Sequence, residues 1–265
     1  MLKFLYALVA LLISGSAFAS TPLAPLITNA NYGASVTLAD GEYDDATPVV
    51  INHSVTIRGS RNAVIHSEIQ IIDGATAHFV GVSFEMNKAG APSHDGFVGD
   101  TFPQNGMIVV LSSSLWLDDV EMRSLAGFNK DAVYVVAGIA HLRTVTQFSR
   151  IDWRLNTATP VELLYGSYGN FFDISGANLA YNILSGASNS TQGNAAIFVV
   201  GGKLTISGAN IFNFGTALYG VQAARASYIQ CGAGVYTTIQ NFSVPIFFDM
   251  TPNTKWIAPG NLCGS

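Results

Sequence analysis

The chain has 265 residues, a net charge of −5 and 11% charged residues, against about 25% in typical globular domains. It carries no cluster of Lys and Arg, which argues against nucleic acid and against an anionic membrane surface as partners. So few charges indicate that part of the surface is buried in a homo-oligomer or serves as an apolar or hydroxyl-rich face.

Residues 1–19 have the pattern of a secretory signal peptide. Lys3 supplies a positive charge, Phe4 to Ile13 is an apolar run too short to span a bilayer, and Ala17-Phe18-Ala19 matches a cleavage site. The alternative is an uncleaved N-terminal anchor or a buried helix. We expect residues 20–265 to form one folded domain that is secreted, periplasmic or exposed on a cell or virion. No membrane contact is expected after cleavage.

A short phrase recurs along the rest of the chain: an apolar strand residue, two turn-like residues, then a small or β-branched residue. Its apolar anchors are Ile57, Phe79, Leu117, Leu142, Ile174, Ile206 and Ile229. The strand-like runs are short and are cut by Gly, Asn, Asp or Ser. A repeat with variable spacing on a constant strand pattern predicts an all-β solenoid, a single-stranded parallel β-helix of about seven coils.

Stacked coils would place equivalent residues next to one another. Asp118 and Arg143 become neighbours one coil apart, which favours a ladder salt bridge over a functional site. Asn178 and Asn210 occupy equivalent places in two nearly identical phrases and are expected to form an asparagine ladder.

Three ring-bearing side chains, His78, Trp116 and His141, share one position of the repeat. This spacing predicts a stacked column on the outer side of the strands and not a metal cluster. No other ligand spacing in the chain matches a known metal motif, so no metal site is predicted.

The two cysteines, Cys231 and Cys263, lie near the C-terminus. Export would place them in an oxidising compartment, where we expect a disulfide that ties the C-terminal tail to the last coil. The alternative is a pair of free thiols.

Two stretches resemble a known superfamily. Gly41-Glu42-Tyr43, Pro48 to Ile51 and Ser54 to Gly59 are similar to the opening coil of pectin-lyase-like β-helix proteins. Ala217 to Ala223, continued through Tyr228-Ile229, resembles coils of phage tailspikes and bacterial adhesins. The resemblance covers most of residues 30–250 and implies a right-handed parallel β-helix. It does not fix a function, because the superfamily includes lyases, hydrolases, adhesins and spikes.

The family's enzymes act on polysaccharides through clustered carboxylates. The one such cluster on a predicted coil face is Asp118, Asp119 and Glu121. The further signatures of the hydrolases and lyases of this superfamily are missing, and paired Asp residues are common in turns. We therefore commit to no catalytic residue and no cofactor; these three carboxylates, with calcium if the chain is a lyase, are the alternative.

The segment from Ser149 to Phe172 is rich in aromatic and Arg side chains. On a loop, such residues suit sugar stacking or a protein interface. The candidate ligand-binding residues are Trp153, Arg154, Tyr165 and Tyr168. The alternative is that Trp153 and Tyr165 anchor the loop against the coil.

These features favour an exported, non-enzymatic β-helix for surface recognition or assembly: an adhesin, a spike-like module or an extracellular structural subunit. Its partners would be a glycan, a cell surface or further copies of the chain. The alternative is a small secreted polysaccharide lyase or glycoside hydrolase.

Overall fold

The computed structural model describes residues 20–86, 106–124, 131–147, 149–153, 159–173, 179–183, 195–206, 209–213, 219–224, 226–231, 237–240, 244–248, 255–257 and 263–264. The expected signal peptide and Arg154 lie outside these ranges. The described residues form strands and one short helix, α2 (Ala24–Thr28). None of the helices in this part of the chain is long and apolar enough to cross a membrane.

The strands form three parallel sheets, as predicted for an all-β parallel fold. The first sheet contains β1 (Ala34–Thr37), β4 (Val55–Arg58), β7 (Thr76–Val80), β10 (Ser114–Asp118), β13 (Ile139–Thr144), β16 (Tyr168–Asp173), β19 (Lys203–Ile206), β22 (Tyr228–Cys231) and β25 (Lys255–Ile257). The second contains β2 (Gly41–Tyr43), β5 (Ala63–Ile65), β8 (Ser83–Met86), β11 (Glu121–Ser124), β14 (Arg150–Asp152), β17 (Leu179–Ile183), β20 (Ala209–Asn213), β23 (Thr237–Gln240) and β26 (Cys263–Gly264).

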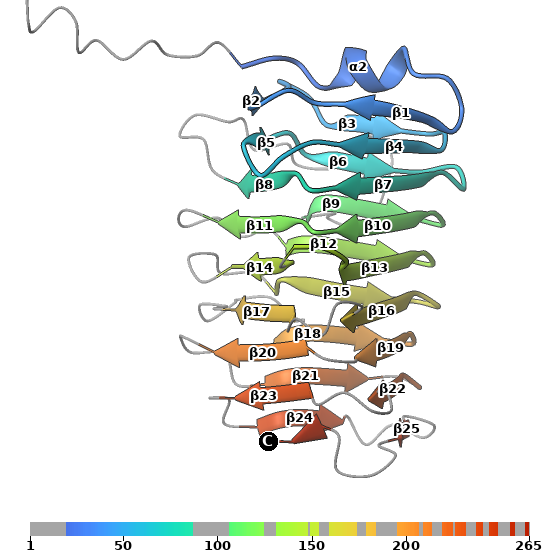
Figure 1. Cartoon of the computed structure of the whole chain (residues 1–265). Coiled ribbons are helices and arrows are strands. Elements are labelled where there is room, and N and C mark those ends of the chain that lie inside the picture. Colours follow the sequence, from blue (N-terminus) through green and yellow to red (C-terminus); the bar gives the residue numbers. More distant parts are fainter. Residues whose placement is uncertain are drawn as a thin grey trace, which may run out of the picture.

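The third sheet contains β3 (Val49–Ile51), β6 (Ile69–Ile71), β9 (Gly106–Leu111), β12 (Asp131–Val136), β15 (Val161–Leu164), β18 (Ala195–Val200), β21 (Tyr219–Ala224) and β24 (Val244–Phe248). Each strand pairs with the third strand before it and the third strand after it in the sequence. The chain therefore visits the three sheets in turn, and its strands stack along one axis (Figure 1).

The core lies between the three sheets. Side chains alternate along each strand, so β4, β5 and β6 point every second residue inward. The predicted anchors Ile57, Phe79, Leu117 and Leu142 pair directly with one another across β4, β7, β10 and β13, and each is at most 2% exposed. The recurring phrase thus marks this stretch of the core correctly.

The same phrase predicts the wrong register further on. Ile206 pairs with Phe171 and not with Ile174, and Asn210 pairs with Ala180 and not with Asn178. β16 ends at Asp173, whereas in the later copy Ile206 is itself the last residue of β19. Ile174 and Asn178 lie outside the described residues. Because Asn210 pairs with Ala180, the expected ladder of Asn178 and Asn210 is wrong.

The corner from the third sheet to the first needs a left-handed residue in successive coils. Ser112, Ala137, Tyr165 and Gly201 have φ between 48° and 60°. The backbone N–H of Ser112, Ala137 and Tyr165 each donates to a carbonyl of the next coil, at 3.0, 3.2 and 2.8 Å. These bonds offset the cost of the left-handed conformation and continue the sheet around the corner.

A second left-handed corner connects the first sheet to the second. Gly81 has φ +75°, and a Cβ added there would lie 2.6 Å from the Gly59 carbonyl oxygen. Because Val80 pairs with Asp118, Asp119 follows at the equivalent place one coil later, with φ 57°. Asp is one of the few non-Gly residues that adopt this conformation readily, so local geometry accounts for Asp119.

The N-terminal end of the stack is covered. Leu23 and Ile27 are fully buried and join the core. Asp45 accepts hydrogen bonds from the backbone N–H of Leu23 at 2.8 Å and of Ala24 at 3.2 Å, at the start of α2. The helix contacts β3, and Thr21 bridges to Tyr43 on β2. Two of the three sheets are therefore closed at this end.

The predicted disulfide stays a prediction. Cys231 is the last residue of β22 and Cys263 the first of β26, which pairs with β23. The side chains of both cysteines lie outside the described part of the structure.

Two glycines with nearly the same φ test the corner geometry. Gly74 (φ +73°) has open space where a Cβ would be, whereas Gly81 would place it against the Gly59 carbonyl. Gly74→Ala is expected to lower the free energy of unfolding by about 1 kcal/mol through backbone strain alone. Gly81→Ala is expected to cost roughly 1–3 kcal/mol more because the coils must separate. Urea denaturation measures both, and equal losses would contradict the close approach.

Candidate functional site

A groove with polar and aromatic side chains lies on the outer face of the first sheet. It has a volume of about 380 Å³. Its lining includes Ser54, Thr56, Thr76, His78, Trp116 and Arg143. These side chains come from four neighbouring strands and from the residue preceding β4, so the groove runs across the coils.

Trp116 is the largest of these side chains and belongs to a column of rings. Its indole stacks on the imidazole of His141, with ring centroids 3.7 Å apart and planes at 20°. His78 meets Trp116 edge-on at 6.4 Å from the other side, and Tyr168 meets His141 at 6.2 Å. The register pairs His78 with Trp116 and Trp116 with His141, which confirms the predicted column.

The column is uncharged at its centre. Burial, together with the positive charge of Arg143, lowers the pKa of His141 to about 4, although Asp118 acts in the opposite direction. His141 is therefore a neutral ring at neutral pH, which suits a flat stack against Trp116. The guanidinium carbon of Arg143 lies 4.5 Å from the centroid of the Trp116 ring and adds a cation–π contact.

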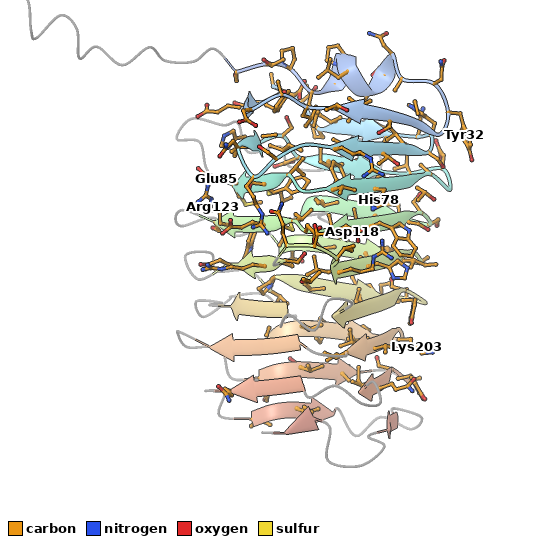
Figure 2. The ribbon with its side chains drawn as sticks, in the orientation of Figure 1. Tyr32, His78, Glu85, Asp118, Arg123 and Lys203 are labelled. Atoms are coloured by element: carbon orange, nitrogen blue, oxygen red, sulfur yellow. The ribbon has the colours of Figure 1, made fainter. Side chains whose placement is uncertain are left out.

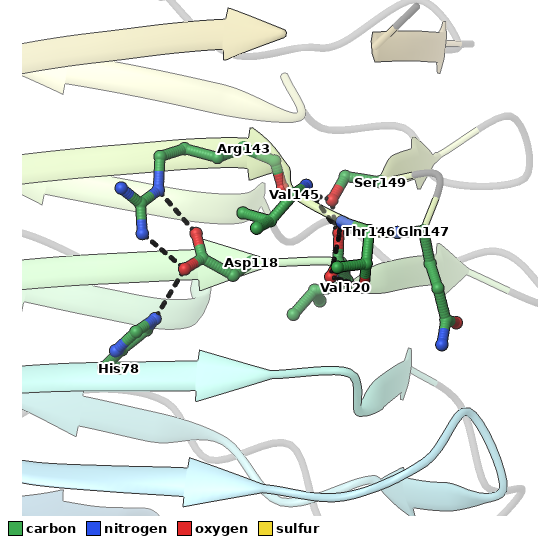
Figure 3. A network of polar contacts seen from close by, with 9 residues as sticks. His78, Asp118, Val120, Arg143, Val145, Thr146, Gln147 and Ser149 are labelled. Atoms are coloured by element: carbon green, nitrogen blue, oxygen red, sulfur yellow. Dashed lines mark hydrogen bonds and ion pairs between the residues drawn. The ribbon is translucent and has the colours of Figure 1, made fainter. Parts of the chain in front are cut away.

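Asp118 fixes two side chains that line the groove, His78 and Arg143 (Figure 3). Its carboxylate accepts hydrogen bonds from Arg143 Nε at 2.6 Å and from Arg143 Nη2, and His78 Nε2 lies 2.7 Å from its Oδ2. Burial raises the pKa of Asp118, but the hydrogen bonds and charges of His78 and Arg143 outweigh it and keep the pKa below its usual value. The predicted ladder pair of Asp118 and Arg143 is present.

Asp119 holds the turn that follows β13. Its carboxylate accepts the backbone N–H of Val145 at 2.7 Å, of Thr146 at 3.0 Å and of Gln147 at 3.0 Å. The Thr146 hydroxyl donates to it at 2.7 Å. Burial raises the pKa of Asp119, but these hydrogen bonds outweigh it and lower the pKa. An acceptor saturated in this way favours the structural role of the paired aspartates.

Glu121 points away from the groove. It lies on β11 of the second sheet, where Arg61 Nη1 approaches its Oε2 at 3.1 Å. The neighbouring coils carry a further pair, Arg123 with Glu85 at 2.8 Å. The three carboxylates considered for catalysis thus bind different partners on two sheets, and none of them lines the groove.

The predicted ligand-binding set is dispersed. The segment that contains it forms strands β14, β15 and β16 as well as loop. Trp153 is fully buried, which favours the anchoring interpretation for this side chain, whereas Tyr165 is 50% exposed at a corner. Tyr168 is the member that extends the ring column of the first sheet. Arg154 lies outside the described residues.

Two buried carboxyl groups were not singled out by the sequence analysis. Glu162 on β15 is 2% exposed and Asp131 on β12 is 5% exposed. Glu162 lies in the register between Tyr134 and Phe198, next to a small apolar cluster outside the third sheet. Its Oε2 atom has no hydrogen-bond partner in the described structure.

Burial shifts both groups toward the protonated form. It raises the pKa of Glu162 from 4.5 to about 7. Burial and then the charge of Glu162 raise the pKa of Asp131 well above its usual value. A single Glu between hydrophobic residues gives no local sequence signal, because its neighbours belong to other coils.

Within the described residues, no group of three or more His, Cys, Asp or Glu side chains is arranged to hold a metal ion. Comparison of the chain with family models, with curated proteins and with solved structures finds no match.

The buried pair predicts a pH dependence of stability. The pKa of Glu162 is raised in the folded state, so its contribution is fully present below pH 4.5 and is lost as the pH rises to about 7. The free energy of unfolding should therefore fall across this window, and Glu162→Gln should reduce that fall. Denaturant unfolding at several pH values measures the slope. Glu121→Gln, which removes a carboxylate from the surface of the second sheet, is the control; an unchanged slope in Glu162→Gln would contradict the prediction.

Proposed function

We propose that this chain is an exported, non-enzymatic recognition module that binds glycans through the groove at Trp116. The observation that carries the proposal is the partly exposed Trp116 ring beside the hydroxyl groups of Ser54, Thr56 and Thr76. An aromatic face stacks on the apolar face of a sugar ring, while hydroxyl and guanidinium groups bond to its oxygens.

The proposal includes the finer architecture: a right-handed single-stranded parallel β-helix of the pectin-lyase-like type. Parallel strands joined by crossovers are almost always right-handed, and the every-third-strand pairing fits a helical coil. The repeat anchors give about seven coils; β1 and β25 would add a coil at each end. Secretion rests on the pattern of residues 1–19.

Rigidity supports recognition over catalysis. Trp116 is held between His78 and His141, and Arg143 is held by Asp118. Side chains fixed before binding lose little conformational entropy when a ligand arrives. A lyase or hydrolase remains the second candidate, with Asp118, Asp119 and Glu121 as its carboxylates and calcium as the cofactor of a lyase.

The partner is a glycan or a cell surface that displays one. Assembly into a homo-oligomer belongs to the proposal as well. Because α2 and Thr21 cover β3 and β2 at the N-terminal end, lateral contact between copies is favoured over end-to-end pairing there.

Trp116→Ala tests the glycan site. Loss of the stacking ring is expected to weaken binding to polysaccharides about tenfold, whereas Trp116→Phe should retain most of it. Isothermal titration with dextran, alginate and dextran sulfate measures the affinities, and thermal unfolding checks that the fold is kept. Val50→Ala removes an exposed apolar side chain from the third sheet, away from the groove, and is the control. Equal binding by wild type and Trp116→Ala would refute the site.

The enzyme alternative has its own test. The double variant Asp119→Asn, Glu121→Gln is compared with wild type for cleavage of the same polysaccharides, followed by the release of reducing ends. We expect no cleavage by either protein. Cleavage by the wild type that the double variant loses would reverse the ranking of the two functions.

A further inference from the structure

The ring column of the first sheet is continued by a second row of side chains. Tyr168 on β16, Lys203 on β19 and Tyr228 on β22 pair with one another in register. Alternate residues of a strand share a face. The register that starts at Trp116 and His141 reaches β16 at position 170 and β19 at position 205, so Tyr168 and Lys203 lie two positions earlier on the same strands. They therefore form one line along the outside of the sheet, on the same face as Trp116.

Lys203 is placed between two aromatic rings. Its Nζ lies 5.3 Å from the centroid of the Tyr168 ring and 5.4 Å from that of Tyr228. Two such contacts hold the ammonium group in position. The side chain is exposed, and among the described residues it forms no ion pair with a carboxylate. Arg143, in contrast, is neutralised by Asp118.

A second groove opens beside this lysine (Figure 2 labels Lys203). It has a volume of about 400 Å³ and is lined by Gly166, Ser167, Tyr168, Gly201, Gly202 and Lys203. Three of its six lining residues are glycines at the corner between the third and first sheets. Gly166 has open space where a Cβ would be, so the groove is free of side chains on that side.

We propose that this second groove is a subsite for the negatively charged group of a glycan whose sugar ring stacks on Trp116. The inference rests on the proposed glycan function and assigns the ligand class: an acidic polysaccharide bearing carboxylate or sulfate groups. Lys203 supplies the positive charge, and the tyrosine rings on either side supply stacking faces.

The two grooves are close enough for a single polysaccharide chain to contact both. Trp116 and Lys203 are on β10 and β19, which are separated by β13 and β16. Three strand spacings of about 4.8 Å place the two strands roughly 14 Å apart along the stack. A ligand that lies along the axis therefore meets the aromatic groove first and the cationic groove a few sugar units later.

A polymer of charged units fits this arrangement better than a neutral one. Lys203 is exposed, and no carboxylate among the described residues pairs with its ammonium group. Binding of a carboxylate or sulfate there would add a charge-assisted bond. A neutral glycan would gain only the stacking contacts.

The experiment compares three polymers on the same protein: alginate oligosaccharides for carboxylate, dextran sulfate for sulfate and dextran as the neutral polymer. Titration calorimetry at low and high salt measures the affinities. We expect the charged polymers to bind more tightly than dextran, with an advantage that salt reduces. Lys203→Met should weaken the charged ligands roughly three- to tenfold and leave dextran unchanged. Methionine keeps contact with both rings, so the column stays packed.

Lys203→Arg should retain the preference, and Arg123→Gln, which removes one positive charge from the second sheet, should not alter it. A preference for alginate or for dextran sulfate alone identifies the anionic group. Equal affinities for charged and neutral polymers, or no effect of Lys203→Met, would overturn the subsite while leaving the Trp116 site intact. Charged ligands that depend on Lys203 but not on Trp116 would refute the Trp116 site alone, and no binding of any polymer refutes both.

Discussion

In-register stacking of parallel strands is the constraint on which the rest of this structure depends. Each residue lies about 4.8 Å from its counterpart in the coils before and after it, so a side chain must suit the neighbours above and below it. Inside, this places Ile57, Phe79 and Leu117 in one apolar line. Outside, it places Trp116 against His141 and Lys203 between two tyrosines.

The same constraint decides which polar groups are available for chemistry. Asp118 faces His78 on one side and Arg143 on the other, and its carboxylate is engaged in contacts with both. The carboxylate of Asp119 accepts hydrogen bonds from the turn after β13. Among the described residues of the first sheet, the ring column, several hydroxyl side chains and Lys203 stay accessible, a surface suited to binding. Asp118 and Asp119 instead hold neighbouring coils and a turn together.

Part of this arrangement follows from the sequence. The recurring phrase located the anchors from Ile57 to Leu142 because each of them occupies the same register position on a strand of the first sheet. It failed in the later copies, where Ile206 pairs with Phe171, three residues before the expected anchor. An error in the register of one strand shifts the predicted partner of every residue on that strand. The sequence pattern therefore did not predict that Lys203 pairs with Tyr168. The burial of Glu162 was not predicted for another reason: its neighbours Tyr134 and Phe198 are distant from it in the sequence.

The helix α2 at the N-terminal end has a consequence for the size of any assembly. Asp45 fixes the start of that helix over the core, and the helix covers the strand that would otherwise be the free edge of the third sheet. A fibre grows by adding subunits to matching faces at both ends. Here two of the three strand edges at the first end are already covered, so only part of that face is left to pair with the strands of another copy.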